Sequence, residues 1–137
     1  MRTAVDTNVL LDVLAAGSAH GPASRETLHR ARLDGALVIC EVVYAELAAA
    51  FEGDRERLAL FLLAAGIRLE RTSETALAEA GASWRAYRAA GGPRSRVLAD
   101  FLVAAHARDA ADRLLSRDRG FYRRWFGDLP VLDPSVR

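Results

Sequence analysis

The sequence predicts an α/β fold in which helices cover both faces of a five-stranded parallel sheet. Short apolar runs alternate along the chain with longer segments whose apolar residues recur at helical spacing. The run Ala36–Cys40 is apolar throughout, which is typical of a strand covered on both faces. The chain of 137 residues has no internal repeat and no linker, so we expect a single domain spanning residues 1–137.

The strand candidates share a short apolar core and lie at Arg2–Asp6, Ala36–Cys40, Ile67–Leu69, Arg113–Leu115 and Leu129–Leu132. The helix candidates follow them and lie at Thr7–Ala16, Pro22–Leu33, Val42–Phe51, 55–65, Ser73–Ala90, Arg96–Arg108 and Asp118–Phe126. Asp54 and Ser73 precede two of these helices and are expected to cap them, because their side-chain oxygens can accept bonds from free backbone N–H groups. Gly66 is expected to end the fourth helix.

Composition excludes several classes of function. Hydrophobic residues make up 51% and charged residues 27%, as in ordinary globular proteins, and the net charge of +1 gives no strong overall attraction to nucleic acid or membranes. All 19 basic residues are arginine, so chemistry that needs a lysine amine is excluded. Cys40 is the only cysteine, which excludes an internal disulfide and a cysteine zinc site.

No basic leader followed by an apolar segment begins the sequence, and no apolar run reaches the ~18 residues of a membrane span. We therefore expect a cytoplasmic protein that does not enter a membrane. His20, His29 and His106 have no metal-ligand spacing and are expected to be structural or surface residues.

Four acidic residues fall near the carboxyl ends of predicted strands, where open parallel sheets bind their ligands. Asp6 closes the first strand, Asp118 follows the strand Arg113–Leu115, and Glu46 lies on the helix after the second strand. Asp100 lies near the start of a helix with apolar neighbours on both sides, and Glu46 has a similar setting. Converging carboxylates repel one another unless a cation joins them, and such oxygen ligands suit Mg²⁺ or Mn²⁺.

Each acid also has a simpler interpretation. Asp6 and Asp118 could each cap the helix that follows, and this is as good an explanation of either residue alone as catalysis is. Asp100 could be a surface acid that favours a helix N-terminus, and Glu46 could be an ordinary surface glutamate. The order and spacing of the four together favour a shared site.

Four segments resemble the motifs of the PIN-domain family, and the small bacterial VapC-type toxins within it are most similar in length. The segments are Asp6–Asn8, Val42–Leu47, Ala99–Ala107 and Ser116–Phe121. The resemblance implies a three-layer α/β/α sandwich with strand order 3-2-1-4-5. It also implies that Asp6, Glu46, Asp100 and Asp118 are catalytic and bind Mg²⁺ or Mn²⁺, with Asn8 and Ser116 as supporting polar residues.

The implied function is a Mg²⁺-dependent endoribonuclease, the toxin of a VapBC-type toxin–antitoxin pair, which hydrolyses RNA phosphodiesters with metal-activated water. The implied partners are an RNA substrate, a cognate VapB-like antitoxin and a second copy in a homodimer. The alternative is a non-catalytic PIN-like module that binds RNA or protein. A phosphoaspartate enzyme is set aside, because position 8 is Asn8 and the chain has no lysine.

Two further groups of residues are candidates for contacts with these partners. Arg94, Arg96, Arg117 and Arg119 lie beside the acidic motifs and are candidates for substrate contact. Phe121 and Trp125 follow them at helical spacing and are expected to be core residues. Several apolar side chains could line a groove for an antitoxin helix, and they are Leu10, Leu14, Leu58, Phe61 and Leu62.

Overall fold

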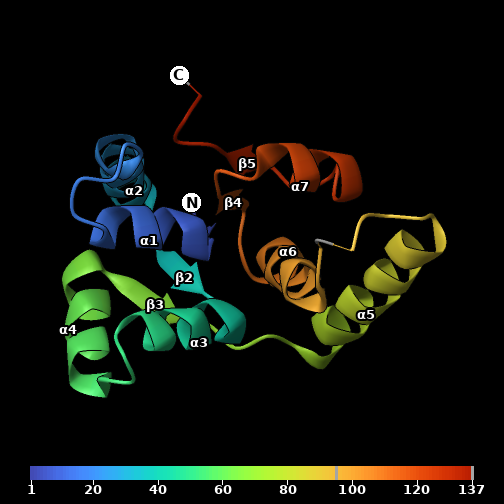
Figure 1. Cartoon of the computed structure of the whole chain (residues 1–137), viewed down its shortest axis with the longest axis horizontal. Coiled ribbons are helices and arrows are strands. Elements are labelled where there is room, and N and C mark those ends of the chain that lie inside the picture. The colour runs from blue at the N-terminus through green and yellow to red at the C-terminus, as the bar shows by residue number, and fades with distance from the viewer. Residues whose placement is uncertain (95, 137) are drawn as a thin grey trace.

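The computed structural model describes residues 1–94 and 96–136, and these contain one five-stranded, all-parallel sheet (Figure 1). The strands are β1 (Thr3–Val5), β2 (Leu37–Ile39), β3 (Ile67–Leu69), β4 (Arg113–Leu115) and β5 (Val131–Leu132). Their order is β3-β2-β1-β4-β5, and the central β1 pairs Thr3 with Leu37 on one side and with Arg113 on the other. The predicted α/β class and strand order are confirmed.

Helices flank the sheet on both sides (Figure 1). They are α1 (Thr7–Leu14), α2 (Gly21–Asp34), α3 (Glu41–Ala50), α4 (Arg55–Ala65), α5 (Glu74–Ala89), α6 (Leu98–Ala110) and α7 (Arg119–Trp125). α6 packs against β1 and β4 on one side and against α5 on the other. The largest differences from the predicted bounds are two residues, at the end of α1, at the start of β5 and at both ends of α6.

The expected helix ends are present. The side chains of Asp54 and Ser73 accept bonds from the backbone N–H groups of Arg57 and Ala76, at 3.1 Å each. Gly66 follows α4 in the left-handed conformation, with φ of 70°, which a glycine adopts without the steric cost that a Cβ imposes.

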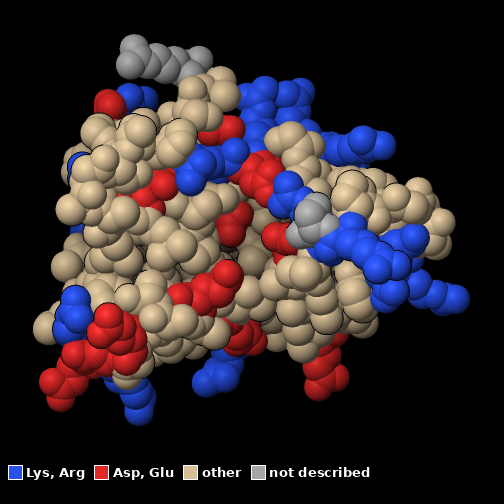
Figure 2. Space-filling view, in the orientation of Figure 1, with Lys and Arg blue, Asp and Glu red and all other residues tan. Residues whose placement is uncertain are grey.

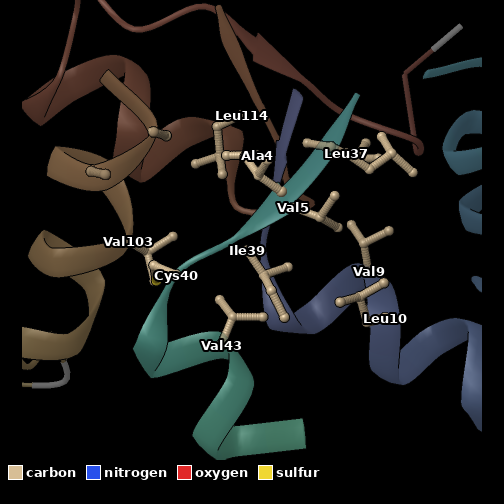
Figure 3. Close-up of a cluster of buried hydrophobic side chains, with 14 of the residues drawn as sticks. Ala4, Val5, Val9, Leu10, Leu37, Ile39, Cys40, Val43, Val103 and Leu114 are labelled. Carbon is tan, nitrogen blue, oxygen red and sulfur yellow. The ribbon is translucent and has the colours of Figure 1, made fainter. Parts of the chain in front are cut away.

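The core forms where the central strands meet the first and third helices. Figure 3 shows Val5, Ile39 and Leu37 of the sheet directed towards Val9 and Leu10 of α1 and Val43 of α3. All three residues of β2 are buried, as its continuous apolar run predicted. The strands therefore end at a fixed edge, and the turns after β1 and β4 hold their polar side chains in defined positions.

The predicted antitoxin groove is wrong for three of its residues. Leu10, Leu58 and Leu62 belong to the core, with exposed fractions of 0%, 1% and 8%. Their helices turn these side chains inward because burial of a leucine stabilises the fold by about 1.5–3 kcal/mol. The exposed leucines of the same helices are Leu11 and Leu14 on α1 and Leu60 and Leu63 on α4.

Within the described residues, none of the helices combines the length and apolar character needed to cross a membrane.

Candidate metal centre

A cavity of about 280 Å³ opens at the carboxyl ends of β1 and β4, and all four predicted acids line it. Asp6 ends β1, Asp118 follows β4, Asp100 lies in the first turn of α6, and Glu46 lies in the middle of α3. Figure 2 shows acidic side chains in a hollow at the centre of this face, with arginine side chains along its upper and right-hand rim. We call this cavity the acidic crevice.

Asp6 is the most firmly held of the four acids. It is the N-cap of α1, and its Oδ1 accepts a 2.8 Å bond from the backbone N–H of Thr7. Its Oδ2 accepts bonds from the Ser116 hydroxyl at 2.8 Å and from the Tyr122 hydroxyl at 3.1 Å. Burial raises the pKa of Asp6, and these three donors oppose the rise because they stabilise the carboxylate. Asp6 thus both caps a helix and lines the crevice.

Asn8 and Ser116 join the turn after β1 to the turn after β4. The Asn8 amide donates to the Ser116 hydroxyl oxygen at 3.3 Å, and its carbonyl accepts from the backbone N–H of Arg117 at 3.1 Å. The Ser116 oxygen also accepts from the backbone N–H of Asp118 at 3.0 Å. These bonds fix the position of Asp118 relative to Asp6.

Asp118 is the first residue before α7, yet its side chain makes no capping bond. Its carboxylate instead forms a two-pronged ion pair with Arg96, whose Nη2 lies 3.0 Å from Oδ1 while Nη1 contacts Oδ2. The Arg96 guanidinium also lies 4.3 Å from the centre of the Phe121 ring. The Asp118 carboxylate therefore faces the crevice while it is paired with the Arg96 guanidinium.

Asp100 and Glu46 complete the crevice from the opposite side. Asp100 is half-buried and accepts a 3.2 Å bond from the backbone N–H of Val97. Partial burial raises the pKa of Asp100, and the negative charge of Asp118 adds to the rise. Glu46 accepts a 2.9 Å bond from the Thr7 hydroxyl and is exposed, so the apolar setting expected from its sequence neighbours is wrong.

The donor set of the crevice fits a hard divalent cation, because four carboxylates from four segments line one small cavity. As the side chains stand, no three His, Cys, Asp or Glu residues in ranges 1–94 and 96–136 form a group that could hold an ion. Arg96 engages Asp118 and Thr7 engages Glu46. Ion binding would therefore need Asp118 to leave Arg96, a side-chain change that leaves the Asp6 network intact.

The four arginine candidates for substrate contact separate in space. Arg96 reaches the crevice, and Arg94 lies exposed on the loop that leads to it. Arg117 turns away and forms a two-pronged ion pair with the buried Asp12, with Nε–Oδ2 and Nη2–Oδ1 distances of 2.6 and 3.1 Å. Arg119 lines a different cavity beside β5. The structure thus favours a structural role for Arg117.

Three residues of this network were not identified as site residues from the sequence. Tyr122 lies one helical turn after Asp118, and this position places its hydroxyl on Asp6. Thr7 follows Asp6 directly and holds Glu46. Asp12 gave no signal in the sequence, because its partner Arg117 is distant along the chain and Ser24, which also donates to it at 2.8 Å, lies on another helix.

Comparisons with known proteins agree with this fold and motif pattern. A family model described as the PIN domain matches residues 3–126. A chain of the VapBC2 complex from Rickettsia felis, bound to a DNA fragment from its promoter, superposes with a TM-score of 0.74 at 18% identity, covering 97% of this chain and 98% of that one. VapBC-1 from nontypeable Haemophilus influenzae gives 0.74 at 20% identity, covering 98% and 99%.

A third solved structure, VapC20 from Mycobacterium tuberculosis, is described as a toxin that cleaves the sarcin–ricin loop. It superposes with a TM-score of 0.57 at 18% identity, covering 82% of this chain and 86% of that one. At these identities the structural likeness establishes the fold alone. No curated protein shows significant sequence similarity to the chain.

Proposed function

The chain belongs to the PIN domain family, and on that premise we propose that it is a metal-dependent endoribonuclease that acts as the toxin of a toxin–antitoxin pair. The observation that carries the proposal is the acidic crevice, in which Asp6, Glu46, Asp100 and Asp118 line one cavity at the carboxyl ends of β1 and β4. The cleavage of the sarcin–ricin loop by one structural relative supports the same reaction class.

Asp6, Asp100, Glu46 and Asp118 would hold the cation, Mg²⁺ or Mn²⁺. A bound divalent cation activates water and stabilises the charge that develops on a reacting phosphodiester. The residues around it have separate tasks. Ser116 and Tyr122 hold the Asp6 carboxylate in one orientation, and Thr7 orients Glu46. Asn8 fixes the spacing of the two turns that carry Asp6 and Asp118.

Cleavage of RNA by the purified protein tests the reaction. We expect Asp6→Asn to reduce the rate by at least about 100-fold, because it removes a ligand charge at the centre of the crevice with little change of shape. EDTA should abolish cleavage in the same way. The matched control is Asp54→Asn, since Asp54 is also a helix N-cap but lies on α4, outside the crevice, and asparagine caps a helix equally well.

Two outcomes would contradict the proposal. Cleavage that survives both Asp6→Asn and EDTA would mean that the acidic crevice is not the source of the activity. Failure of the wild-type protein to cleave any RNA with Mg²⁺ or Mn²⁺, while it still binds RNA or protein, would favour a non-catalytic module instead.

The proposed toxin requires a small antitoxin, and the solved relatives in toxin–antitoxin complexes support such a partner. The exposed leucines of α1 and α4 are our candidates for its contact surface, and Leu60 and Leu63 are exposed by 66% and 78%. We expect Leu60→Ser with Leu63→Ser to weaken co-purification with the protein of the neighbouring reading frame and to leave RNA cleavage unchanged. Loss of both properties together would contradict this assignment.

We further propose that the protein acts in the cytoplasm and forms a homodimer. Sedimentation equilibrium of the purified chain tests the homodimer, and a monomer at every concentration would contradict it.

A further inference from the structure

A second hollow lies beside the acidic crevice and has a different lining. It runs between the C-terminal half of α5, the loop 91–94 and α7, and it comprises two adjoining cavities of about 490 and 600 Å³. Both cavities are lined by Tyr87, residues 91–93 and Arg96. We call the two together the aromatic–arginine groove. Their volumes fall within the range of sites that bind small organic groups.

Each cavity of this groove is lined by one tryptophan that has an arginine against its ring. Trp125 lines the smaller cavity, and the Arg124 guanidinium lies 5.5 Å from the centre of its ring. Trp84 lines the larger cavity, and Arg88 lies 5.0 Å from the centre of its ring. Both tryptophans are partly exposed, and both arginines are exposed. Trp125 was expected to be a core residue, and it packs against the core but stays partly exposed.

The floor of the groove is rigid. The Tyr87 hydroxyl donates a 2.6 Å bond to the backbone carbonyl of Pro93, and the Tyr87 ring contacts that of Trp125 with centres 4.8 Å apart. A Cβ at position 92 would lie 2.4 Å from the Tyr87 ring, so the loop can pack this closely only with Gly92. The groove is therefore formed before any ligand arrives, which lowers the entropic cost of binding.

The groove and the acidic crevice are continuous. Arg96 lines both cavities of the groove and pairs with Asp118, which lines the crevice. Val97 lines both the larger cavity and the crevice. A polymer that crosses the crevice would therefore extend into the groove without leaving the surface. Figure 2 shows arginine side chains on this side of the hollow.

We propose that the aromatic–arginine groove binds unpaired bases of an RNA strand next to the phosphodiester that lies in the crevice. This inference rests on the proposed function and adds the kind of RNA that is bound. Base rings stack on tryptophan whatever the base, and arginine binds the phosphates between them. The described residues that line the two cavities include four arginines and no acid, so their charge complements a phosphate backbone. The bases of a duplex are stacked on one another within the double helix, so their faces are not free to stack on Trp84 and Trp125.

The intrinsic fluorescence of the protein provides the test, because Trp84 and Trp125 are the only two tryptophans of the chain. The full-length protein in EDTA is titrated with a single-stranded oligoribonucleotide of about 12 nucleotides, a length within the usual range of single-strand sites. A duplex of the same sequence and an abasic strand of the same length are the comparison probes. We expect quenching by the single strand and binding at least about tenfold weaker for the other two.

Variants distinguish stacking from charge. Trp84→Leu and Trp125→Leu should each weaken binding of the single strand by about tenfold or more and leave binding of the abasic strand unchanged. Arg88→Gln should weaken binding of both strands. The control is Arg57→Gln, because Arg57 also lies over an aromatic ring, that of Phe51, but on α4. Trp84→Leu and Arg88→Gln keep the test valid if loss of the Trp125 contact with Tyr87 destabilises the fold.

Binding of the abasic strand as tightly as the RNA, or tryptophan variants without effect, would overturn the proposal. A change of oligomeric state in Trp84→Leu with unchanged RNA affinity would also overturn it, and would make the groove an interface between copies. Failure of the proposed function is a separate result, seen as binding of the single strand without cleavage when Mn²⁺ is supplied. If the wild type cleaves and the tryptophan variants cleave with unchanged KM, the function stands and the groove assignment fails.

Discussion

Replacement of Arg96 by glutamine should separate two effects that the wild-type protein combines. Arg96 neutralises Asp118 in the protein without metal, and the same guanidinium occupies the carboxylate that a metal ion would need. The Arg96→Gln protein should therefore be less stable without metal and should bind Mn²⁺ more tightly. A residue that only stabilises the fold would not produce the second change.

The size of both effects follows from the geometry. The ion pair has two contacts, but 28% of the Arg96 side chain and 32% of the Asp118 side chain are exposed, so solvent screening limits it to about 1 kcal/mol. Stacking of the guanidinium on Phe121 adds about 0.5–1 kcal/mol. Loss of both lowers the melting temperature of the metal-free variant by about 4–8 °C. Only the ion pair competes with metal, so Mn²⁺ affinity should rise about fivefold.

Scanning calorimetry in EDTA measures the first effect, and titration calorimetry with Mn²⁺ measures the second. The control is Arg94→Gln, which removes an exposed arginine of the same loop. The reasoning is refuted if Arg96→Gln binds Mn²⁺ no more tightly than wild type, or if Arg94→Gln increases the affinity by the same factor. The first result would mean that Asp118 is not a ligand, and the second that Arg96 acts only through general charge.

Three further predictions concern single side chains. Asp100→Asn should raise the melting temperature of the metal-free protein at neutral pH, because the pKa of Asp100 is raised in the folded protein and its ionisation therefore opposes folding. The gain should vanish in thermal scans below pH 3.8, where Asp100 is protonated in both states. The absence of a gain at neutral pH would contradict this prediction. Wild-type stability should fall as the pH drops below 6.5, because burial lowers the pKa of His106 in the folded protein and only the unfolded chain then takes up the proton. In denaturant titrations, the unfolding free energy of His106→Gln should change less with pH than that of the wild type. Arg117→Gln should lower the unfolding free energy by about 1–3 kcal/mol, because it leaves the buried Asp12 without its arginine partner. Arg119→Gln, the control, should lower it little, and equal losses in the two variants would contradict this prediction.

The fold could be predicted largely from local patterns. Ile67–Leu69 and Arg113–Leu115 coincide with β3 and β4, because short apolar runs between helices with clear caps leave little ambiguity. The four acids were found because each lies close to a strand end or in a recognisable motif. Periodicity did not show which leucines of α4 are buried: Leu58 and Leu62 lie in the core whereas Leu60 and Leu63 are exposed, and the orientation of the helix decides this.

Partners distant along the chain were beyond prediction. Arg96 pairs with Asp118 and Arg117 with Asp12, and both pairs depend on tertiary placement that a motif does not encode. For the same reason, Arg117 and Arg119 could not be separated from Arg96 by sequence, although they differ in environment. The exposure of Trp125 depends on how α7 packs against α5. The spacing of Phe121 and Trp125 alone predicted a core position for Trp125.

The acids of the crevice differ in how firmly their carboxylates are held, and this difference determines which of them would have to move for a cation to bind. Asp6 is buried and accepts bonds from Thr7, Ser116, Tyr122 and, at 3.5 Å, the Asn8 amide, so its carboxylate cannot reorient without breaking them. Asp118 and Glu46 each have one side-chain partner and more contact with solvent. Asp6 would therefore hold a cation without reorienting, whereas Asp118 would have to leave Arg96 and Glu46 would have to leave Thr7. On release from Asp118, Arg96 lies between the crevice and the aromatic–arginine groove, where an RNA phosphate would replace the lost carboxylate.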